Sequence, residues 1–390
     1  MRIALVNLYW PREATTVAQL IEADATRREL AAELARRGHD VHVVQEGPED
    51  ATVTAHGATW HVHTPRFETR AGRRVLRALG HLSPAVLAPA TGPLAALARI
   101  HPEIIHSFDL VHHPSLALLG WFAERRGVPL VAHYHGGEPA HHLLTRPIER
   151  FALRRVSAVC FTDIDRAQAW PLPKHRIVPL VESSTTFEIR DRTAARKRTG
   201  MRGNPAIFCP GRLDAVKDPL TTIRGFAIFA RAAPEAHLTL TYTQASLFGE
   251  CKQRVDTLEL SEQVSFAGRA PHADMNDWFS SADIVVQSSV REVCGIAIVE
   301  AMACGIPPVV TDIPAFRFTT ANLTSRFPVG DAAGLAAALV ATWKNPPKAA
   351  VLRAYFDANL SFDAMAAQLE KLYNQLTRHS SGSAPTAPPA

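Results

Sequence analysis

Short apolar runs alternate with amphipathic stretches along the first half of the chain. Residues 2–8 read RIALVNL, a continuous apolar run that predicts a buried strand. Residues 16–37 carry apolar side chains at helical spacing and end at Gly38, which predicts one long helix. Further strands are predicted at residues 40–45, 59–63, 103–107, 129–134, 158–162 and 176–180. Strands separated by helices indicate an α/β domain with a parallel sheet.

The same alternation starts again in the second half. It follows residues 190–203, a polar segment rich in Arg, Lys and Thr, which we interpret as a solvated connector rather than a nucleic-acid-binding patch. Strands are predicted at residues 206–209, 237–242, 264–267, 283–288 and 308–311, and helices at residues 219–233, 248–260, 297–303 and 332–343. A chain of 390 residues is long enough for the two α/β domains that this pattern predicts.

Composition excludes several classes of protein. The sequence is 47% hydrophobic and 20% charged. This charged fraction is close to the average of globular proteins, so a mostly disordered chain is not expected. No apolar run of about 18 residues occurs, so a membrane-spanning chain is not expected either. Its 42 Lys and Arg against 37 Asp and Glu give a net charge of +5, a small excess that does not predict binding to nucleic acid. A locally basic site for phosphates or an anionic surface remains compatible with it.

The cysteines and the termini bear on the cellular setting. The chain has 5 cysteines, an odd number, and no C-x-x-C pair, which argues against a disulfide framework and a structural zinc site. The N-terminal apolar run is too short for a signal peptide, so a reducing, cytoplasmic setting is expected. Residues 379–390 are rich in Pro, Ser and Ala and are expected to form a disordered tail.

The stretch richest in candidate chemistry is residues 288–312, SSVREVCGIAIVEAMACGIPPVVTD. A predicted strand ends here, a polar loop with Glu292 follows, and Gly295 precedes a helix that carries Glu300. Ligands bind at the carboxyl ends of parallel strands, and the free N–H groups of a helix start favour phosphate. The two carboxylates can accept hydrogen bonds from the hydroxyls of one elongated ligand. Alternatively, Glu300 is an ordinary helix residue and Glu292 a partner of the helix dipole.

A second polar cluster, PGRLDAVKDP at residues 210–219, follows the first predicted strand of the second domain. Gly211 permits a tight turn there. Arg212 and Lys217 place two cations near the same sheet edge, an arrangement suited to a diphosphate. Asp218 before Pro219 also resembles a helix N-cap followed by a first-turn proline, which needs no ligand. Both interpretations hold together, because they use different residues.

The two motifs together resemble those of a known family. GRLDAVKD, followed by Glu292, seven further residues, Glu300 and AMACGIPPVVTD, is similar to the retaining glycosyltransferases of family 4, which have the GT-B fold. The likeness is strongest over residues 205–315. It implies two Rossmann-like domains facing across a cleft, at residues 1–185 and 186–360. It also implies that a last helix within residues 361–378 crosses back to the first domain.

The resemblance also implies roles for individual residues. Arg212 and Lys217 match the basic pair that binds the diphosphate of the donor, beside Gly211. Glu292 matches the glutamate that holds hydroxyls of the donor sugar, and Glu300 the one that holds the ribose hydroxyls. Arg269 matches the position that holds the nucleotide base, and His135 matches a histidine that contacts the donor sugar. The backbone that meets the sugar and the distal phosphate is that of Val293, Cys294, Gly295 and Ile296.

Three departures from the family's pattern concern the acceptor, the hinge and the sugar pocket. Residues 8–13 lack the glycine pair that many relatives have after the first strand, which suggests a different acceptor pocket. Residues 181–185 lack the usual Asn-Gly turn at the domain junction. Cys294 replaces a common aromatic residue beside Glu292. The sequence therefore leaves the donor sugar, the base and the acceptor unidentified.

The expected reaction transfers a sugar from a nucleotide-diphosphate sugar to an acceptor with retention, by front-side substitution, and without a metal ion or other cofactor. Histidines at 133, 135, 141 and 142 lack the spacing of a metal site. The alternatives are a nucleotide-sugar epimerase or hydrolase of the same fold, or a non-catalytic binding module. A dehydrogenase is disfavoured, because no G-x-G-x-x-G follows a strand. Basic residues within 66–79 allow two interpretations, a surface for peripheral membrane contact or a solvated helix or loop.

Overall fold

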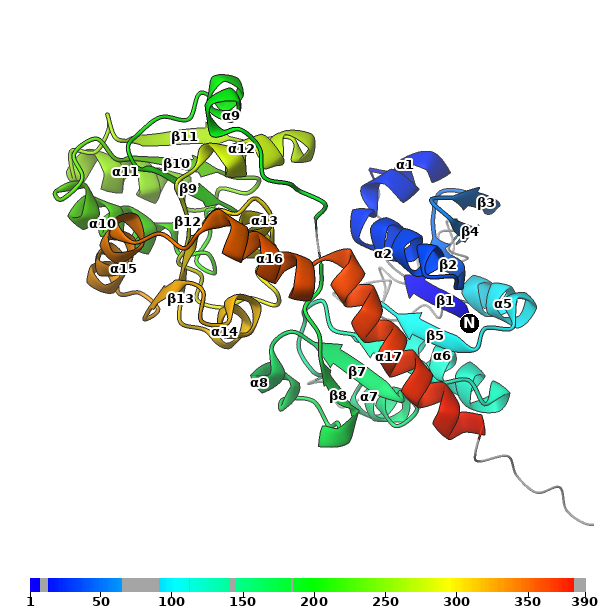
Figure 1. The fold of residues 1–390 in the computed structure, drawn as a ribbon. Helices are drawn as coiled ribbons and strands as arrows, with labels where there is room; N and C mark the ends of the chain where they lie inside the picture. Colours follow the sequence, from blue (N-terminus) through cyan, green and yellow to red (C-terminus); the bar gives the residue numbers. More distant parts are fainter. Residues whose placement is uncertain (8–12, 65–90, 112, 141–144, 184, 382–390) are drawn as a thin grey trace, which may run out of the picture. The chain divides into compact units, whose positions relative to one another are not determined.

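The computed structural model describes residues 1–7, 13–64, 91–111, 113–140, 145–183 and 185–381, and the following account is confined to them (Figure 1). The chain divides into two compact units. The first comprises Met1–Leu180 with the C-terminal segment from Met365, and the second comprises Val181–Ala364. The sequence had suggested limits at residues 185/186 and 360/361. The basic stretch 66–79 lies outside the described residues.

The first unit contains an eight-stranded sheet in the order β3-β4-β2-β1-β5-β6-β7-β8. All neighbours pair in parallel except β3 and β4, which are antiparallel. The central strands are buried on both faces, which accounts for their uninterrupted apolar sequences. The strands are β1 (Arg2–Asn7), β2 (Asp40–Glu46), β3 (Ala51–Ala55), β4 (Ala58–His63), β5 (Ile104–Ser107), β6 (Leu130–His133), β7 (Ala158–Phe161) and β8 (Ile177–Pro179).

The helix predicted over residues 16–37 is wrong as a single element. The structure has two helices there, α1 (Val17–Ala23) and α2 (Ala25–Arg36). Asp24 lies between them, and its carboxylate accepts from the N–H of Arg27, so it caps the second helix. Asn7 at the end of β1 donates to the other Asp24 oxygen at 3.3 Å, which fixes the break against the sheet. A buried capping aspartate therefore overrides the continuous helical pattern.

The last helix, α17 (Phe362–Ser381), packs on the first unit from Met365 onward. Its Tyr373 is fully buried, and the hydroxyl lies 2.5 Å from Nδ1 of the equally buried His106 on β5. Burial holds the pKa of His106 well below its ordinary value. The other helical segments of this unit are α5 (Thr91–Ile100), α6 (His113–Arg126), α7 (Thr145–Leu153), α8 (Ile164–Ala167) and the 3₁₀ turn Lys174–Arg176.

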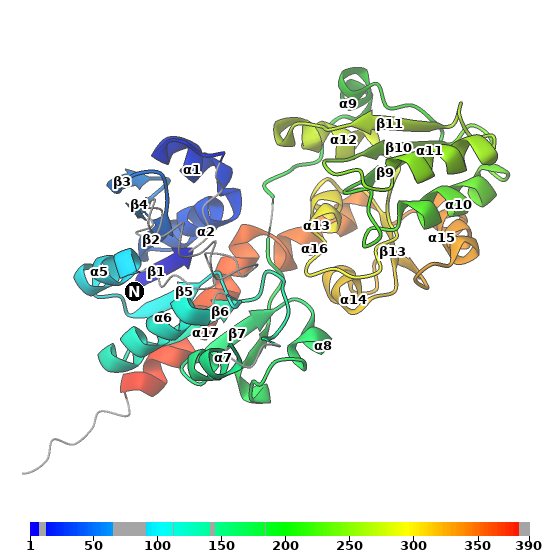
Figure 2. The ribbon, with the colours of Figure 1, turned by 180° about the vertical axis from the view of Figure 1, so that it is seen from behind.

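The second unit contains an all-parallel, six-stranded sheet in the order β11-β10-β9-β12-β13-β14. Helices cover both faces of this sheet (Figures 1 and 2), and an apolar core lies on each face. Helices α10, α11 and α15 form one core with the sheet, and α12, α13 and α16 form the other. The strands are β9 (Ala206–Pro210), β10 (His237–Thr241), β11 (Val264–Gly268), β12 (Ile284–Gln287), β13 (Pro308–Thr311) and β14 (Ser325–Phe327). The helical segments are α9 (Arg192–Thr199), α10 (Pro219–Ala230), α11 (Phe248–Thr257), the 3₁₀ turn His272–Asp274, α12 (Met275–Ser281), α13 (Ile296–Ala303), α14 (Pro314–Thr320), α15 (Ala332–Lys344) and α16 (Ala349–Asn359).

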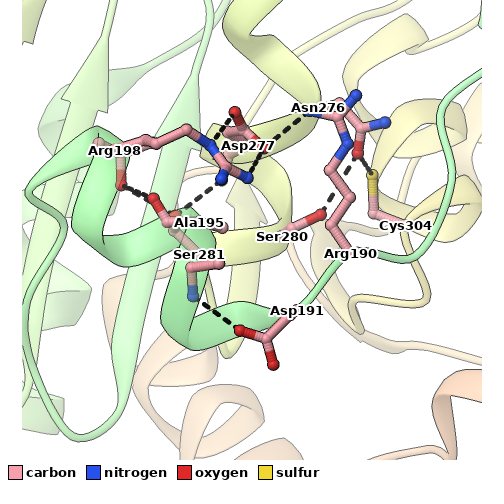
Figure 3. A network of polar contacts seen from close by, with 11 residues as sticks. Arg190, Asp191, Ala195, Arg198, Asn276, Asp277, Ser280, Ser281 and Cys304 are labelled. Carbon is pink, nitrogen blue, oxygen red and sulfur yellow. Dashed lines mark hydrogen bonds and ion pairs between the residues drawn. The ribbon is translucent and has the colours of Figure 1, made fainter.

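The prediction that residues 190–203 form a solvated connector is wrong in part, because the segment is largely exposed but is more than a connector. Helix α9 lies within this segment and packs on α12 through charged side chains (Figure 3). Arg198 makes two hydrogen bonds of 2.6 Å to the carboxylate of Asp277, and Arg190 makes a third of 2.8 Å. These bonds, led by those from Arg198, lower the pKa of Asp277 to about 2. The arginines of this segment therefore serve the fold of the second unit.

The described residues include neither a membrane-spanning helix nor a cluster of metal ligands. None of their helices combines the length and the apolar character that crossing a bilayer requires. No group of three or more His, Cys, Asp or Glu side chains lies close enough together there to hold a metal ion.

Candidate functional site

The two polar motifs meet at the carboxyl ends of β9 and β12 in the second unit. These strands are neighbours in the sheet, and the strand order runs away from them in opposite directions. Such a reversal creates a crevice between the loops that leave the two strands, and open α/β sheets bind ligands there. The loops are residues 211–218 after β9 and residues 288–295 after β12.

The loop after β9 is organised around a carboxylate that sequence reasoning missed. Oδ1 of Asp214 accepts from the N–H groups of Val216 at 3.0 Å and Lys217 at 2.9 Å. Its Oδ2 pairs with Nε of Arg212 at 2.8 Å. Gly211 begins the loop at φ +144°, and a Cβ there would contact the Lys217 side chain at 3.9 Å. Asp214 thus pairs with the guanidinium of Arg212 and holds the backbone of Lys217, and Gly211 supplies the positive φ with which the loop begins.

Asp218 closes this loop as the sequence suggested. Its carboxylate accepts from the N–H of Thr221 at 3.1 Å, and Pro219 is the first residue of α10. The same residue adopts a left-handed backbone at φ +43°. The N-cap therefore fixes where the loop ends without using Arg212 or Lys217.

The structure brings Lys217 and Glu292 together from loops 75 positions apart. Nζ of Lys217 lies 2.5 Å from Oε1 of Glu292, and Oγ of Ser289 donates to that same oxygen at 2.7 Å. The side chains of Lys217 and Glu292 are 21% and 12% exposed, whereas that of Arg212 is 41% exposed. Glu292 is thus held by a cation and a hydroxyl, and Arg212 faces solvent at the rim.

Several hydrogen bonds join the two loops into one rigid unit. The N–H of Val290 donates to the carbonyl of Val216 at 2.8 Å, and Oγ of Ser288 donates to that of Asp218 at 2.6 Å. The buried Gln287 side chain donates to the carbonyl of Pro210. Because these bonds cross between loops, the relative position of Lys217 and Glu292 is set by the backbone.

The start of α13 provides backbone N–H groups at the same sheet edge. Gly295 is its N-cap, at φ +78°, and no side chain caps the helix. The first N–H groups of a helix have no acceptor within it. A Cβ on Gly295 would lie 2.5 Å from the Phe316 ring, so only glycine fits. Cys294 beside it is 4% exposed and Ile296 is 49% exposed, while Val293 is partly buried.

Glu300, inside α13, is a buried carboxylate without a partner. The residue is only 6% exposed, and among the described residues its carboxylate makes no hydrogen bond or ion pair. Burial alone raises the pKa of Glu300 to about 8. An ionised carboxylate in such surroundings is strongly unfavourable until hydrogen-bond donors reach it. This is not the behaviour of an ordinary solvated helix residue.

Arg269 and His135 belong to neither of the two loops. Arg269 is exposed and follows β11, which β10 separates from β9 in the sheet. His135 belongs to the first unit, where it follows β6 and is partly buried. Its ring lies 4.6 Å from that of His133 and 5.7 Å from that of Phe108. His133, the alternative weighed from the strand pattern, is 1% exposed, so His135 is the more accessible of the two.

Comparison with known proteins then identifies the family. Residues 191–356 match the family described as Glycosyl transferases group 1, and residues 23–180 match the Glycosyl transferase 4-like domain. The chain belongs to the group 1 glycosyl transferases. The family expected from the two motifs is thereby confirmed.

Individual relatives resemble this glycosyl transferase over different lengths. The mannosylfructose-phosphate synthase of Agrobacterium fabrum is 34% identical over 146 residues, which span 35% of this chain and 32% of that protein. A D-inositol 3-phosphate glycosyltransferase of Kineococcus radiotolerans is 27% identical over 378 residues, which span 87% of this chain and 83% of that one. The match to the first is therefore local, and that to the second covers both units.

Solved structures confirm the fold of two Rossmann-like α/β domains in this glycosyl transferase. The sucrose-phosphate synthase of Thermosynechococcus elongatus aligns with a TM-score of 0.67 and 20% identity over 97% of this chain and 99% of its own. Anabaena Alr3699/HepE, solved with UDP and glucose, aligns with a TM-score of 0.67 and 18% identity over 96% of this chain and 100% of its own. At these identities the likeness concerns the fold alone.

Proposed function

We propose that this glycosyl transferase moves a sugar from a nucleoside-diphosphate sugar to an acceptor hydroxyl with retention of anomeric configuration and without a metal ion. The observation that carries the proposal is the cluster at the ends of β9 and β12. It combines two cations, the three carboxylates of Asp214, Glu292 and Glu300, and a helix N-terminus at one switch point. Relatives named as glycosyltransferases, and the complexes of HepE with UDP and UDP-glucose, support a donor of this class.

We assign the proposed roles to the residues of the cluster from their charge and burial. Lys217 and Arg212, beside Gly211, bind the diphosphate, since they are the cations at the crevice. The backbone of Val293–Ile296 meets the distal phosphate and the sugar, because its first helical N–H groups lack acceptors.

The carboxylates take the hydroxyls of the donor. Glu300 accepts hydrogen bonds from the ribose hydroxyls, which supply the partners that the protein does not. Glu292 accepts from hydroxyls of the donor sugar once Lys217 turns to phosphate. Arg269 serves the nucleotide base and His135 the donor sugar; these two roles rest on the family resemblance.

The proposed chemistry is a front-side substitution. The bond from the anomeric carbon to the β-phosphate oxygen breaks, and a bond from that carbon to the acceptor oxygen forms on the same face. The acceptor proton passes to the departing phosphate oxygen. Lys217 and Arg212 stabilise the charge that develops on this phosphate, so catalysis is electrostatic and positional. Their two positive charges take the part that a divalent metal plays in other phosphate-leaving reactions.

The test begins with the donor. Nucleotide sugars are screened by thermal shift, because a ligand that binds only the folded state raises the melting temperature. The best binder is then incubated with candidate acceptors, with and without EDTA, and the anomeric configuration of the product is read by NMR. Transfer with retention in EDTA is expected. An inverted product refutes the mechanism, and loss of activity in EDTA refutes metal independence.

The same experiment separates the alternatives. Epimerisation or hydrolysis of the donor at full rate without an acceptor would replace transferase activity by the corresponding reaction. A donor that binds but is not consumed with any acceptor would indicate a binding module.

A further inference from the structure

An aromatic and arginine-rich surface lies on the first unit, on two helices that the proposed reaction does not use. Helices α6 and α7 pack side by side there (Figures 1 and 2). Trp121 on α6 is 42% exposed, and Ile148 and Phe151 on α7 are 38% and 42% exposed. Large apolar side chains are exposed here together rather than singly, which marks a surface that contacts something. We call it the α6–α7 face.

Two arginines lie over the exposed aromatic rings. The guanidinium of Arg125 lies 4.7 Å from the centre of the Trp121 ring, and that of Arg155 lies 3.7 Å from the centre of the Phe151 ring. Six arginines occupy α6, α7 and the two residues that follow α7: Arg125, Arg126, Arg146, Arg150, Arg154 and Arg155.

The acidic residues of the two helices offset only part of this charge at the surface. Glu124 pairs with Arg155 at 2.8 Å. Glu149 is 3% exposed and accepts from the N–H of Ala140 at 2.7 Å, so it faces the protein. The face thus presents apolar side chains within a field of positive charge.

We propose that the α6–α7 face docks on an anionic phospholipid surface. Arginine guanidinium groups bind lipid phosphates, while Trp and Phe partition into the interface between headgroups and acyl chains. Ile148 favours a bilayer over nucleic acid, because an aliphatic side chain neither stacks on a base nor binds a phosphate. The proposal is independent of the glycosyl-transfer chemistry.

The test uses the full chain and vesicles. Flotation is measured with vesicles of phosphatidylcholine alone and with vesicles that contain about 30% phosphatidylglycerol, at low and high salt. Binding is expected only to the anionic vesicles, and it should weaken with salt because the charges are exposed. Equal binding to both compositions would overturn the proposal, as would no binding to either.

Variants locate the binding surface. Arg150→Glu with Arg154→Glu reverses two exposed charges, and neither side chain has an ion pair in the described structure. Each arginine lost near such a membrane weakens partition about fivefold, so this pair should reduce binding at least 25-fold by that estimate. The matched control, Arg231→Glu with Arg254→Glu, makes the same charge change on exposed sites of the second unit. Equal losses in both variants, or unchanged binding in the first, would refute the assignment.

Tryptophan fluorescence reports insertion into the membrane, which electrostatic binding alone does not cause. Insertion of the Trp121 ring should shift tryptophan emission to the blue when anionic vesicles are added, and Trp121→Phe should abolish that shift while keeping most of the binding. Persistence of the shift in this variant would show that another part of the chain enters the membrane. Circular dichroism melting of every variant excludes loss of fold as the cause.

Discussion

Replacing Glu300 with Gln should stabilise the second unit in alkaline solution while weakening donor binding. The free carboxyl has its pKa raised from 4.5 to about 8 by burial. Below the lower value it is protonated in both the folded and the unfolded chain. Between the two values only the folded state keeps the proton, so the free energy of unfolding falls as pH rises, and the loss is complete above about pH 8. Gln is neutral throughout and avoids this loss.

The size of this change in the free energy of unfolding follows from the raised pKa of Glu300. A pKa raised from 4.5 to about 8 corresponds to at most about 5 kcal/mol of stability lost between acid and alkaline solution. At most about 3 kcal/mol of this loss falls between pH 6 and pH 9, because part of it is already complete at pH 6. Relaxation around the buried charge reduces the observed value, and about 1 kcal/mol over that interval is the smallest difference that supports the reasoning. For a unit of this size, each kcal/mol moves the melting temperature by about 2–4 °C.

Scanning calorimetry at pH 6 and pH 9 tests this prediction, because it resolves the transitions of two units in one chain. The control is Glu262→Gln, at an exposed position of the same unit. Glu300→Gln should lose less stability than the parent between the two pH values, and the control should behave like the parent. A Glu300→Gln protein that is less stable than the parent at pH 9 would refute the argument from burial. Donor affinity of the variant, measured separately, should fall about tenfold or more, since an amide accepts fewer hydrogen bonds.

Three further predictions concern the same sheet edge. Lys217→Ala should lower kcat at least 100-fold and change KM much less, and the exposed Lys252→Ala should change neither; steady-state kinetics decide, and an active Lys217 variant would remove it from the mechanism. Ser289→Ala releases one of the two partners of Glu292 and should lower kcat about tenfold, with partial rescue by Ser289→Thr; equal loss in both variants would indicate a packing effect. Gly295→Ala brings a Cβ to 2.5 Å from the Phe316 ring at a positive φ and should cost about 1–3 kcal/mol in unfolding free energy; an unchanged denaturation midpoint would contradict it.

Much of the fold could be predicted because its strands are buried on both faces. Residues such as Ile207 and Phe208 face opposite cores, so the apolar run identifies the strand without any knowledge of its neighbours. β3 and β14 were missed for the opposite reason. β3 is an exposed edge strand, and β14 has only three residues, of which two are polar.

The errors arose where polar side chains have specific partners. Asp24 breaks a continuous helical pattern because it caps α2, and the arginines near α9 bind Asp277 and Asp283. From composition alone, one expects such charged residues to be solvated and without partners in the protein. Their partners lie far along the chain, so no local pattern reveals them.

The site was predictable in its residue types but not in its contacts. The motifs contain Lys217 and Glu292, yet β10 and β11 intervene in sequence between the two loops that carry them. Only the adjacency of β9 and β12 in the sheet brings these loops together. Asp214 and Ser289 carried no signal beyond being polar residues near a strand end.

The Lys217–Glu292 ion pair has a consequence for the release of product. In the free protein each group satisfies the other at 2.5 Å. On the proposed roles, a complete donor compensates both when the pair opens, since its phosphate takes Lys217 and its sugar hydroxyls take Glu292. The nucleotide diphosphate left after transfer still attracts the lysine but no longer offers hydroxyls to the glutamate. Glu292 then competes with the nucleoside diphosphate for Lys217. Re-formation of the ion pair therefore favours release of this product before the next turnover.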